Sequence, residues 1–517
     1  MEAEPYLIMK IVVSVVLGGL VGLIFHLYNV LWLRQERSRS KLQKQGITGP
    51  PPSFLLGNIP EMTRIKLQVA PRDEQNVGFI AHEWFSTVFP HIIKWQNEYG
   101  PVFVYSTGNI QQVCVTDVHM AKEISQCTSL SLGKPSYLSK DRGPLLGQGI
   151  ISSNGPIWSY QRKIIAPEFY LDKVKMMINL MVDSTTTMLK SWESRIEIKG
   201  GIADIKVDED LRSLSADVIS RACFGSNYSK GEQIFARLRL LQKTMSMSSI
   251  GIPGMRYFPS KNNRDIWKLD KEIHSLILTV VKQRMKSPSE KNLLQTILEA
   301  AGDYDAFPPN VSRDKFIVDN CKNIYFAGHE TSAITASWSL MLLAAHPDWQ
   351  DRVRAEVLEI CKGNNPDADM LRRMKTLTMV IQETLRLYPP AVFVVREALQ
   401  DLEFNDIVYP RGMGIQIPIP IIQQHPDLWG PDAHQFNPER FARGILGASK
   451  ISQAYMPFGV GARTCAGQNF AMTELKVILC LTLSKFCFSL SPSYCHLPTF
   501  KLVVEPGHGV CLCMKKV

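Results

Sequence analysis

The segment 458–467, with the sequence Phe-Gly-Val-Gly-Ala-Arg-Thr-Cys-Ala-Gly, constrains the fold of this chain more than any other stretch. Gly459 and Gly461 permit a tight turn and a close approach of the backbone to a ligand. Cys465 follows directly before an apolar pattern that predicts a helix. Because helix N-termini favour a thiolate over a thiol, we expect an ionised cysteine here. One thiolate without a second cysteine nearby suits haem iron, whereas a glycine-rich turn before a cysteine is, taken alone, more often structural.

Length and composition limit the alternatives. The chain has 517 residues, enough for a large core, and a formal net charge of +10. Its basic residues are scattered, with one cluster near the N-terminus, so we expect no nucleic-acid binding. Eleven cysteines occur without disulfide-like or zinc-like spacing. The catalytic part is therefore expected in a reducing compartment.

The N-terminus predicts a membrane anchor. Residues 11–25 are apolar except for Ser14, and the run continues with interruptions to Leu33. This is about the 20 residues that a bilayer span requires. The basic residues that follow place the C-terminal side in the cytosol. We expect an anchor with a basic flank over 1–45, a proline-rich hinge over 46–60 and a catalytic domain over 61–517, although the hinge equally fits an ordinary linker.

A long helix is expected over residues 314–345, with Gly328, His329, Glu330 and Thr331 at its centre. Glycine inside a helix costs about 1 kcal/mol relative to alanine, so the space it frees should be needed. We expect a groove for dioxygen beside Gly328. The Thr331 hydroxyl and the Glu330 carboxyl are candidates for proton supply, and His329 is assigned no role.

Two further patterns place polar or charged groups together. Trp158 and Arg162 are four residues apart, so an indole N–H and a guanidinium share one helix face. Two aligned donors suit a carboxylate, although such a pair alone is more often a surface cation–π contact. Glu383 and Arg386 share another helix face, and Arg440 adds a second guanidinium.

Other elements are expected from periodicity and turn residues. They are a hairpin over 102–115, a helix opened by Asp117, a loop over 136–151, amphipathic helices over 174–192, 211–223 and 234–245, a methionine-rich break over 245–256, strands at 407–409 and 415–419, and a final hairpin over 503–514.

These motifs, in this order along the whole chain, resemble the cytochrome P-450 superfamily. The resemblance implies a mainly α fold with small β-sheets, a single catalytic domain behind an N-terminal transmembrane helix. It makes Cys465 the axial ligand of haem b iron. The implied roles are oxygen activation for Gly328, Glu330 and Thr331, and a buried structural ion-pair core for Glu383, Arg386 and Arg440. The implied contacts of the haem and its propionates are Trp158, Arg162, Arg396, Phe458, Gly459, Arg463 and Gly467.

The resemblance also implies a substrate pocket, for which ordinary core packing is an equal alternative at each position. Its residues are Phe326, Ala327, Val392, Phe393 and Val394.

The implied function is that of a membrane-bound haem-thiolate monooxygenase, which inserts one oxygen atom of O2 into an apolar metabolite. No nucleotide or flavin motif fits, so electrons from NADPH should arrive through NADPH–cytochrome P-450 reductase. The expected location is the endoplasmic reticulum membrane, single-pass, with the catalytic domain facing the cytosol. The expected partners are that reductase, membrane lipid and a lipophilic small molecule.

Three stretches, 153–158, 164–169 and 346–350, resemble a plant branch that includes gibberellin oxidases. They favour hydroxylation or epoxidation of a gibberellin or related diterpenoid acid. Triterpenoids or other lipophilic metabolites are the alternative substrates. A non-oxygenating haem-thiolate isomerase or lyase and a haem sensor stay open, although the Gly-x-Glu-Thr motif counts against the isomerase.

Overall fold

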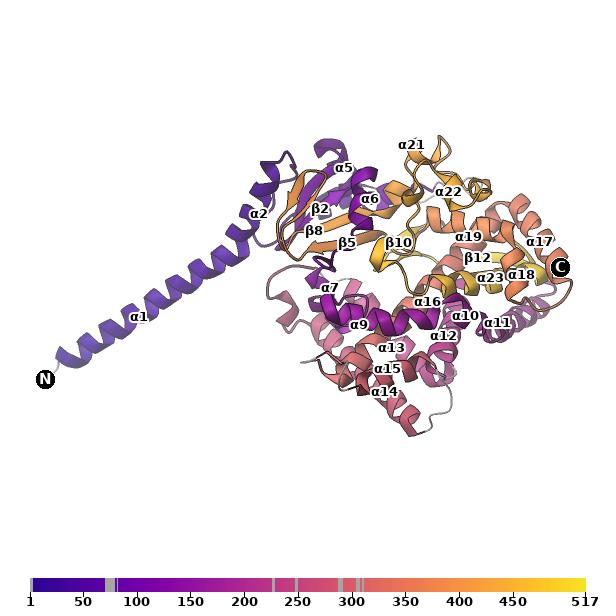
Figure 1. Cartoon of the computed structure of the whole chain (residues 1–517), viewed down its shortest axis with the longest axis horizontal. Coiled ribbons are helices and arrows are strands. Elements are labelled where there is room, and N and C mark those ends of the chain that lie inside the picture. Colours follow the sequence, from indigo (N-terminus) through magenta and orange to yellow (C-terminus); the bar gives the residue numbers. More distant parts are fainter. Residues whose placement is uncertain are drawn as a thin grey trace.

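The computed structural model describes residues 3–69, 80, 82–225, 228–246, 250–286, 292–303, 307–308 and 311–517. The described chain is mainly helical with small sheets, as predicted. Figure 1 shows a folded body from which one long N-terminal helix projects. The five-stranded sheet lies where this helix meets the body, and most of the helices form the rest.

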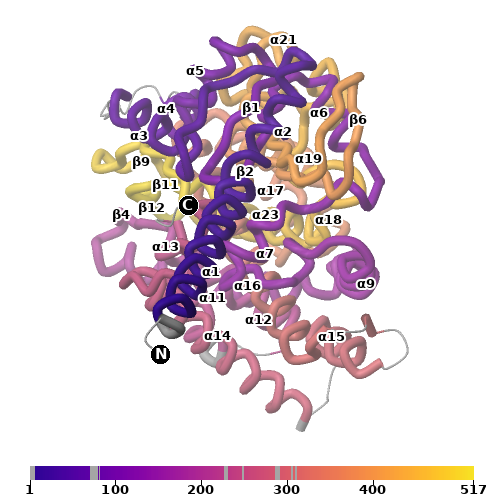
Figure 2. The backbone as a smooth tube through the Cα atoms, turned by 90° about the vertical axis from the view of Figure 1, so that its left-hand side faces the viewer, coloured from indigo at the N-terminus to yellow at the C-terminus, as the bar shows by residue number. Residues whose placement is uncertain are grey.

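The N-terminal helix is one continuous rod made of α1 (Ala3–Tyr28), a π-helical turn η1 (Asn29–Leu33) and α2 (Arg34–Gln43). Within the described chain it is the one helix long and apolar enough to span a membrane, over Tyr6–Gln43, with a mean hydropathy of 2.5. Its apolar window is not buried against the protein, and the helix projects from the body in Figure 1. Figure 2 shows the same helix from its N-terminal end, in front of the body. This finding is consistent with the expected anchor.

The proline-rich hinge is packed against the body. Arg39 in α2 is 2% exposed, and its Nη2 donates to the carbonyl groups of Gly49, at 2.7 Å, and Pro50, at 2.6 Å. The backbone N–H of Val104 donates to the carbonyl of Thr48 at 3.0 Å, so the hinge extends the sheet beside β1. The folded body therefore begins within α2, before the expected hinge.

The main sheet has the strand order β1-β2-β8-β5-β3. The predicted hairpin is confirmed as β1 (Val102–Thr107) and β2 (Ile110–Val115). β2 pairs in parallel with β8 (Gly414–Pro418), and β8 pairs antiparallel with β5 (Phe393–Ala398), which pairs with β3 (Leu132–Gly133). β5 contributes lining residues to the main cavity, and β3 leads directly into Lys134, which lines it too.

The core is organised around α16 (Arg313–Ala345), whose bounds match the predicted long helix. Ser312 caps it, since its hydroxyl accepts from the N–H of Lys315. Most of its side chains are buried, and it packs against α12 (Val207–Phe224), α19 (Lys375–Leu387) and α23 (Gln468–Lys485). The remaining major helices are α5 (Pro90–Tyr99), α6 (Val118–Gln126), α9 (Gly155–Ile165), α11 (Ile178–Ile198), α13 (Tyr228–Ser246), α14 (Lys261–Lys286), α15 (Leu293–Gly302) and α17 (Pro347–Cys361).

Shorter elements complete the described fold. Asp117 caps α6 as expected, because its Oδ1 accepts from the N–H of Met120 at 2.7 Å. The predicted strand at 407–409 is β7 (Ile407–Tyr409), which pairs with β6 (Leu402–Phe404). The other short helices are α3 (Ile59–Gln68), α4 (Phe85–Val88), η2 (Ala166–Phe169), α10 (Leu171–Lys175), η3 (Met255–Tyr257), α18 (Ala368–Arg373), α20 (Ile419–Gln423), α21 (Pro426–Trp429), η4 (Pro438–Phe441), α22 (Ile445–Ala448), η5 (Ser452–Ala454) and η6 (Gly461–Arg463).

Two predictions about elements are wrong. The stretch 136–151 contains helices α7 (Ser136–Lys140) and α8 (Gly143–Leu146), and Pro144 near the start of α8 favours a helix there. The final hairpin is also wrong. β11 (Val504–Pro506) pairs with β10 (Pro498–Phe500), whereas β12 (Cys511–Lys516) pairs with β4 (Ile202–Lys206) and β9 (Phe486–Leu490). The intervening turn thus joins two sheets. Of the expected break over 245–256, residues 247–249 lie outside the described residues.

Candidate active site

The main cavity has a volume of about 340 Å³ and lies between α9, α16, β5 and the segment that leads into α23. Cys465 forms part of its wall, as do Phe458, Gly459 and Gly467. Most of the other lining side chains are apolar, which suits a flat organic ligand that has few polar groups.

The backbone of the cysteine segment is a tight turn that presents Cys465 to the cavity. The N–H of Cys465 donates to the carbonyl of Phe458 at 2.8 Å, and the N–H of Gly459 donates to Met456 at 2.9 Å. Gly461 has φ 78°, and a Cβ there would lie 2.3 Å from the carbonyl oxygen of Ser125. Only glycine fits this position, so the sequence pattern follows from the geometry.

Burial raises the pKa of the Cys465 thiol above its ordinary value, while the N–H of Gly467 and the charge of Arg162 act in the opposite direction. The helix α23 begins three residues later, at Gln468. The N–H of Gly467, next to the start of this helix, thus acts in the expected direction and favours the thiolate, but burial has the larger effect on the pKa. A bound metal ion deprotonates a coordinating thiol outright, so the site suits a metal-bound thiolate.

Four cationic side chains line the same cavity, namely Lys134, Arg162, Arg396 and Arg463. Arg162 Nη1 donates to the carbonyl of Thr464 at 2.7 Å. No aspartate or glutamate lines the cavity, and none of the four forms an ion pair with a carboxylate in the described part of the chain. Sequence reasoning missed Lys134. Lys134 lies between a short strand and a helix in a stretch without a recognisable motif, so the sequence offered no signal for it.

These cations are held in place by the protein but lack their counter-charges. Arg463 donates to the carbonyl of Ser153 at 3.1 Å and to Asn154 Oδ1 at 2.9 Å, and its guanidinium lies 4.2 Å from the ring centroid of Trp158. Burial, assisted by Arg396, lowers the pKa of Lys134 well below its ordinary value. Burial also lowers the pKa of Arg463 and of Arg396, each to about 10. Bound anions would offset the mutual repulsion of these four cations.

A haem group fits this arrangement. It would place iron at the sulfur of Cys465 and its two propionates among the four cations, while the apolar walls would cover the porphyrin. Among the described residues, no group of three or more His, Cys, Asp or Glu side chains offers an alternative metal site. The cysteine is thus the one protein ligand that the cavity offers to iron.

Gly328 and Thr331 both line the cavity, as expected. The Thr331 hydroxyl donates to the carbonyl of Ala327 at 2.7 Å, one helical turn earlier. The expected groove beside Gly328 is occupied, because a Cβ at this position would lie 2.6 Å from Cδ1 of Ile219 in α12. The glycine therefore allows α12 and α16 to pack closely. Both Gly328 and the Ile219 side chain line the cavity.

Glu330 does not line the cavity. It is 1% exposed, and its Oε1 accepts from Arg212 Nε at 3.1 Å. Arg212 also pairs with Glu505 at 2.8 Å, so the carboxyl belongs to a buried ion-pair network that joins α12, α16 and β11. His329 lies 3.3 Å from the second oxygen, and burial lowers its pKa. Glu330 and Thr331 are consecutive residues of one helix, so their side chains point in different directions. The sequence motif alone did not indicate which of them faces the cavity.

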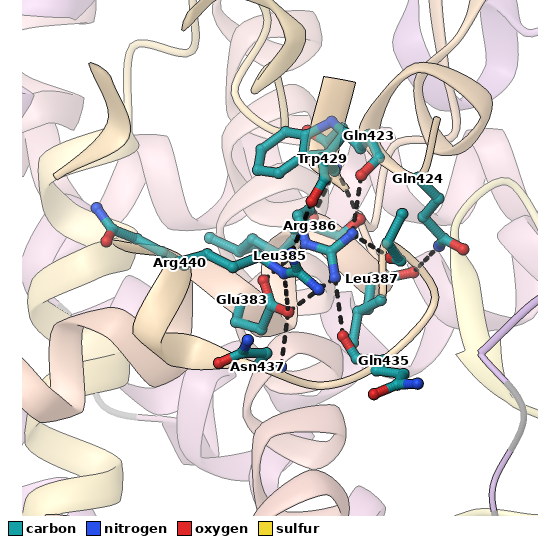
Figure 3. Close-up of polar contacts among 12 residues, drawn as sticks. Glu383, Leu385, Arg386, Leu387, Gln423, Gln424, Trp429, Gln435, Asn437 and Arg440 are labelled. Atoms are coloured by element: carbon teal, nitrogen blue, oxygen red, sulfur yellow. Dashed lines mark hydrogen bonds and ion pairs between the residues drawn. The ribbon is translucent and has the colours of Figure 1, made fainter. Parts of the chain in front are cut away.

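Glu383, Arg386 and Arg440 come together in a buried core, as the resemblance implied (Figure 3). Arg386 Nε lies 2.6 Å from Glu383 Oε2, and Arg440 Nε lies 3.5 Å from Glu383 Oε1. Asp432, which the sequence did not single out, pairs with Arg440 at 2.5 Å. Arg386 also donates to the carbonyls of Gln423, Ala433 and Gln435. The cluster joins α19 to the segment before the cysteine and does not line the cavity.

The expected substrate-pocket residues divide into two groups. Ala327, Phe393 and Val394 line the cavity, whereas Phe326 and Val392 do not. Val392 is 2% exposed, and its carbonyl accepts from the N–H of Ile419. Val392 precedes β5, whereas Phe393 and Val394 are the first two residues of that strand and both reach the cavity. Sequence reasoning missed apolar lining residues from distant elements, which are Ile150, Ile151, Ile165, Ile219, Ile324 and Leu385.

A comparison with protein families decides the identity of this site. A family model described as Cytochrome P450 matches residues 79–513. The chain belongs to the cytochrome P450 family. Cytochrome P450 714C2 of Oryza sativa subsp. japonica is 53% identical over 500 residues, which cover 95% of each chain. Cytochrome P450 714A2 of Arabidopsis thaliana is 45% identical over 509 residues, or 96% of each chain.

A third relative, Cytochrome P450 714B3 of Zea mays, is 47% identical over 525 residues, which cover 100% of this chain and 98% of the relative. The similarity thus extends over the whole P450, from the N-terminal helix to the last strand. The protein is a cytochrome P450 monooxygenase, and its family binds haem through a cysteine thiolate. The predicted family, fold and cofactor are confirmed.

Proposed function

We propose that this P450 oxidises a gibberellin or a related diterpenoid acid by hydroxylation or epoxidation. It acts from the endoplasmic reticulum membrane, with its catalytic domain in the cytosol, and receives electrons from NADPH through NADPH–cytochrome P-450 reductase. The observation that carries the catalytic part is one cavity that combines Cys465 with four cations for which the described residues provide no carboxylate partner.

Cys465 is the proposed ligand of haem iron, and Lys134, Arg162, Arg396 and Arg463 are the proposed partners of the propionates. The haem, when bound, supplies the activation of O2 and the insertion of one oxygen atom into the substrate. The tight turn at 458–467 fixes the sulfur, since its backbone hydrogen bonds leave the segment little freedom. The protein thus contributes position and charge.

Thr331 is the proposed group that positions a proton at the reaction site. Its hydroxyl lies on the cavity wall, where it donates to a backbone carbonyl and can accept a hydrogen bond from water. Glu330 is the proposed source of that proton. Because Arg212 holds its carboxylate outside the cavity, Glu330 reaches the cavity only when this ion pair opens.

The substrate assignment rests on the resemblance of 153–158, 164–169 and 346–350 to the branch with gibberellin oxidases, and on the apolar cavity. Ala327, Phe393 and Val394 are the proposed contacts of a rigid hydrocarbon. A substrate carboxylate needs a polar partner. The hydroxyls of Ser332 and Thr335 line the cavity, and Thr335 would have to give up its hydrogen bond to the carbonyl of Thr331, at 2.8 Å, to donate to that carboxylate.

The test uses microsomes that contain the full chain and a plant reductase, with microsomes carrying the Cys465→Ser variant as the control. A panel of gibberellins and kaurenoic acids is incubated with NADPH, and products are identified by mass spectrometry. We expect an NADPH-dependent product that gains one oxygen atom. Turnover of a triterpenoid or fatty acid, with no diterpenoid product, would reject the substrate class and leave the monooxygenase assignment intact.

A further inference from the structure

A second cavity, of about 550 Å³, lies outside the haem site. It is bounded by the segment 139–144, the loop 250–257 and the start of α14. It shares no lining residue with the main cavity. The short helix α8 contacts both, because Pro144 lines the second cavity while the Leu146 carbonyl accepts from Asn323 of the main cavity at 2.8 Å.

The walls of this cavity are tied together by polar contacts. Asp141 pairs with Arg256 at 3.2 Å and accepts from the N–H of Gly251 at 3.2 Å. Asn263 Nδ2 donates to the carbonyls of Met255 and Phe258, each at 2.8 Å, which fixes the loop against α14. The cavity is therefore a built feature of the fold.

Arg142 is the unbalanced charge of this cavity. It is 7% exposed, its Nη1 donates to the carbonyl of Met245, and its Nε has no hydrogen-bond partner. No carboxylate in the described ranges forms an ion pair with it, because the adjacent Asp141 is engaged by Arg256. The neighbouring Asp141 offsets this buried charge only in part, and a buried guanidinium without a paired anion is unfavourable, so the cavity favours a further negative partner.

The rest of the wall is apolar. Met255, Ile266 and Trp267 line the cavity, and Met255 and Trp267 are 46% and 37% exposed, respectively. Large apolar side chains beside a cavity of this volume suit a hydrocarbon body. Lys140 adds a further positive charge, so the lining cations outnumber the one lining carboxylate.

We propose that this second cavity binds a lipophilic carboxylic acid, with its carboxylate on the Arg142 guanidinium and its hydrocarbon body against Met255, Ile266 and Trp267. Guanidinium and carboxylate form two parallel charge-assisted hydrogen bonds, which neutral groups of the same shape cannot replace. The site shares no lining residue with the main cavity, so a ligand there does not compete directly for the contacts of a ligand in the main cavity.

The experiment measures binding to full-length, haem-loaded protein in detergent by equilibrium dialysis. An azole that ligates the haem iron first fills the main cavity, and its spectral shift confirms this. Radiolabelled ent-kaurenoic acid and palmitic acid are then compared with their methyl esters, with protein-free micelles as the blank. We expect one equivalent of acid to bind in the presence of the azole and each ester to bind about 10-fold more weakly than its acid. The acid that binds more tightly identifies the hydrocarbon body as rigid or flexible.

Three variants test the contacts, with the haem spectrum and melting temperature as checks of folding. Arg142→Met should weaken acid binding about 10-fold and leave ester binding unchanged. Arg264→Met is the matched control, because this exposed arginine of α14 does not line the cavity, and it should change the acid affinity by less than about 3-fold. Trp267→Ala should weaken acid and ester together, and it keeps the test decisive if Arg142→Met fails to fold. The proposal would be overturned if no acid binds in the presence of the azole, or if acid and ester bind equally well.

Discussion

Glu474→Gln is predicted to stabilise the folded P450 at pH 8 far more than at pH 5. Glu474 lies in α23 and has no exposed surface, and the polar groups that act on its carboxyl are the hydroxyls of Ser332 and Ser215. Burial raises its pKa to about 7 from its ordinary 4.5, while the hydroxyls of Ser332 and Ser215 partly offset the effect. The folded protein therefore holds a proton that the unfolded chain loses at lower pH.

The sign follows from this difference. Below pH 4.5 the carboxyl is protonated in both the folded and the unfolded state, so its burial does not lower the free energy of unfolding through ionisation. The free energy of unfolding falls as the pH rises from 4.5 towards 7, because only the unfolded state ionises freely, and it changes no further above 7. The interval between 4.5 and about 7 corresponds to roughly 3 kcal/mol. Glutamine has the same shape and does not titrate, so the variant avoids this loss.

The assay is thermal unfolding of the haem-loaded protein at pH 5 and pH 8, at one scan rate. We expect the difference in melting temperature between the variant and the wild type to be larger at pH 8 than at pH 5, by on the order of 3 °C. Glu123→Gln, at an exposed position, is the control and should shift both measurements equally. A constant difference between the variant and the wild type from pH 5 to pH 8 would refute the assignment of a neutral Glu474.

Three further predictions test packing, proton supply and the anchor. Gly328→Ala should lower the free energy of unfolding by about 1–3 kcal/mol through overpacking, which appears as a lower melting temperature. The double variant with Ile219→Ala should be destabilised by less than the sum of the two single variants, and additive effects would contradict the close contact. Thr331→Ala should keep the haem spectrum but lower product per NADPH about 10-fold and raise peroxide, and unchanged coupling would reject its role. Deletion through Leu33 should release protein from membranes with a normal haem spectrum, whereas deletion through Lys44 should also reduce melting temperature, because it removes buried residues of α2; equal stability of the two would contradict the packed hinge.

Sequence reasoning succeeded where one continuous segment carries the geometry. The turn around Cys465 needs glycine at fixed positions, and α16 has a cap and a long apolar pattern, so both were predictable. The Glu383 core was predictable in part, since two of its charges share one helix face, while Asp432 comes from a separate loop.

The remainder depends on contacts between distant segments. Glu330 faces Arg212, which lies 118 residues earlier, and nothing in the local motif indicates this partner. β12 pairs with β4, about 300 residues away, so the apparent hairpin at 503–514 was a misleading local pattern. Lys134 belongs to the cation cluster only because β3 pairs with β5.

The most direct test of the central claim is the CO difference spectrum of the reduced protein with Cys465 replaced by serine. We expect Cys465→Ser to lose the thiolate-type spectrum, because serine cannot supply the sulfur that faces the cavity. Cys487→Ser, at a half-buried position in β9, should retain it. A thiolate-type spectrum that persists in Cys465→Ser, or disappears in Cys487→Ser alone, would contradict the account.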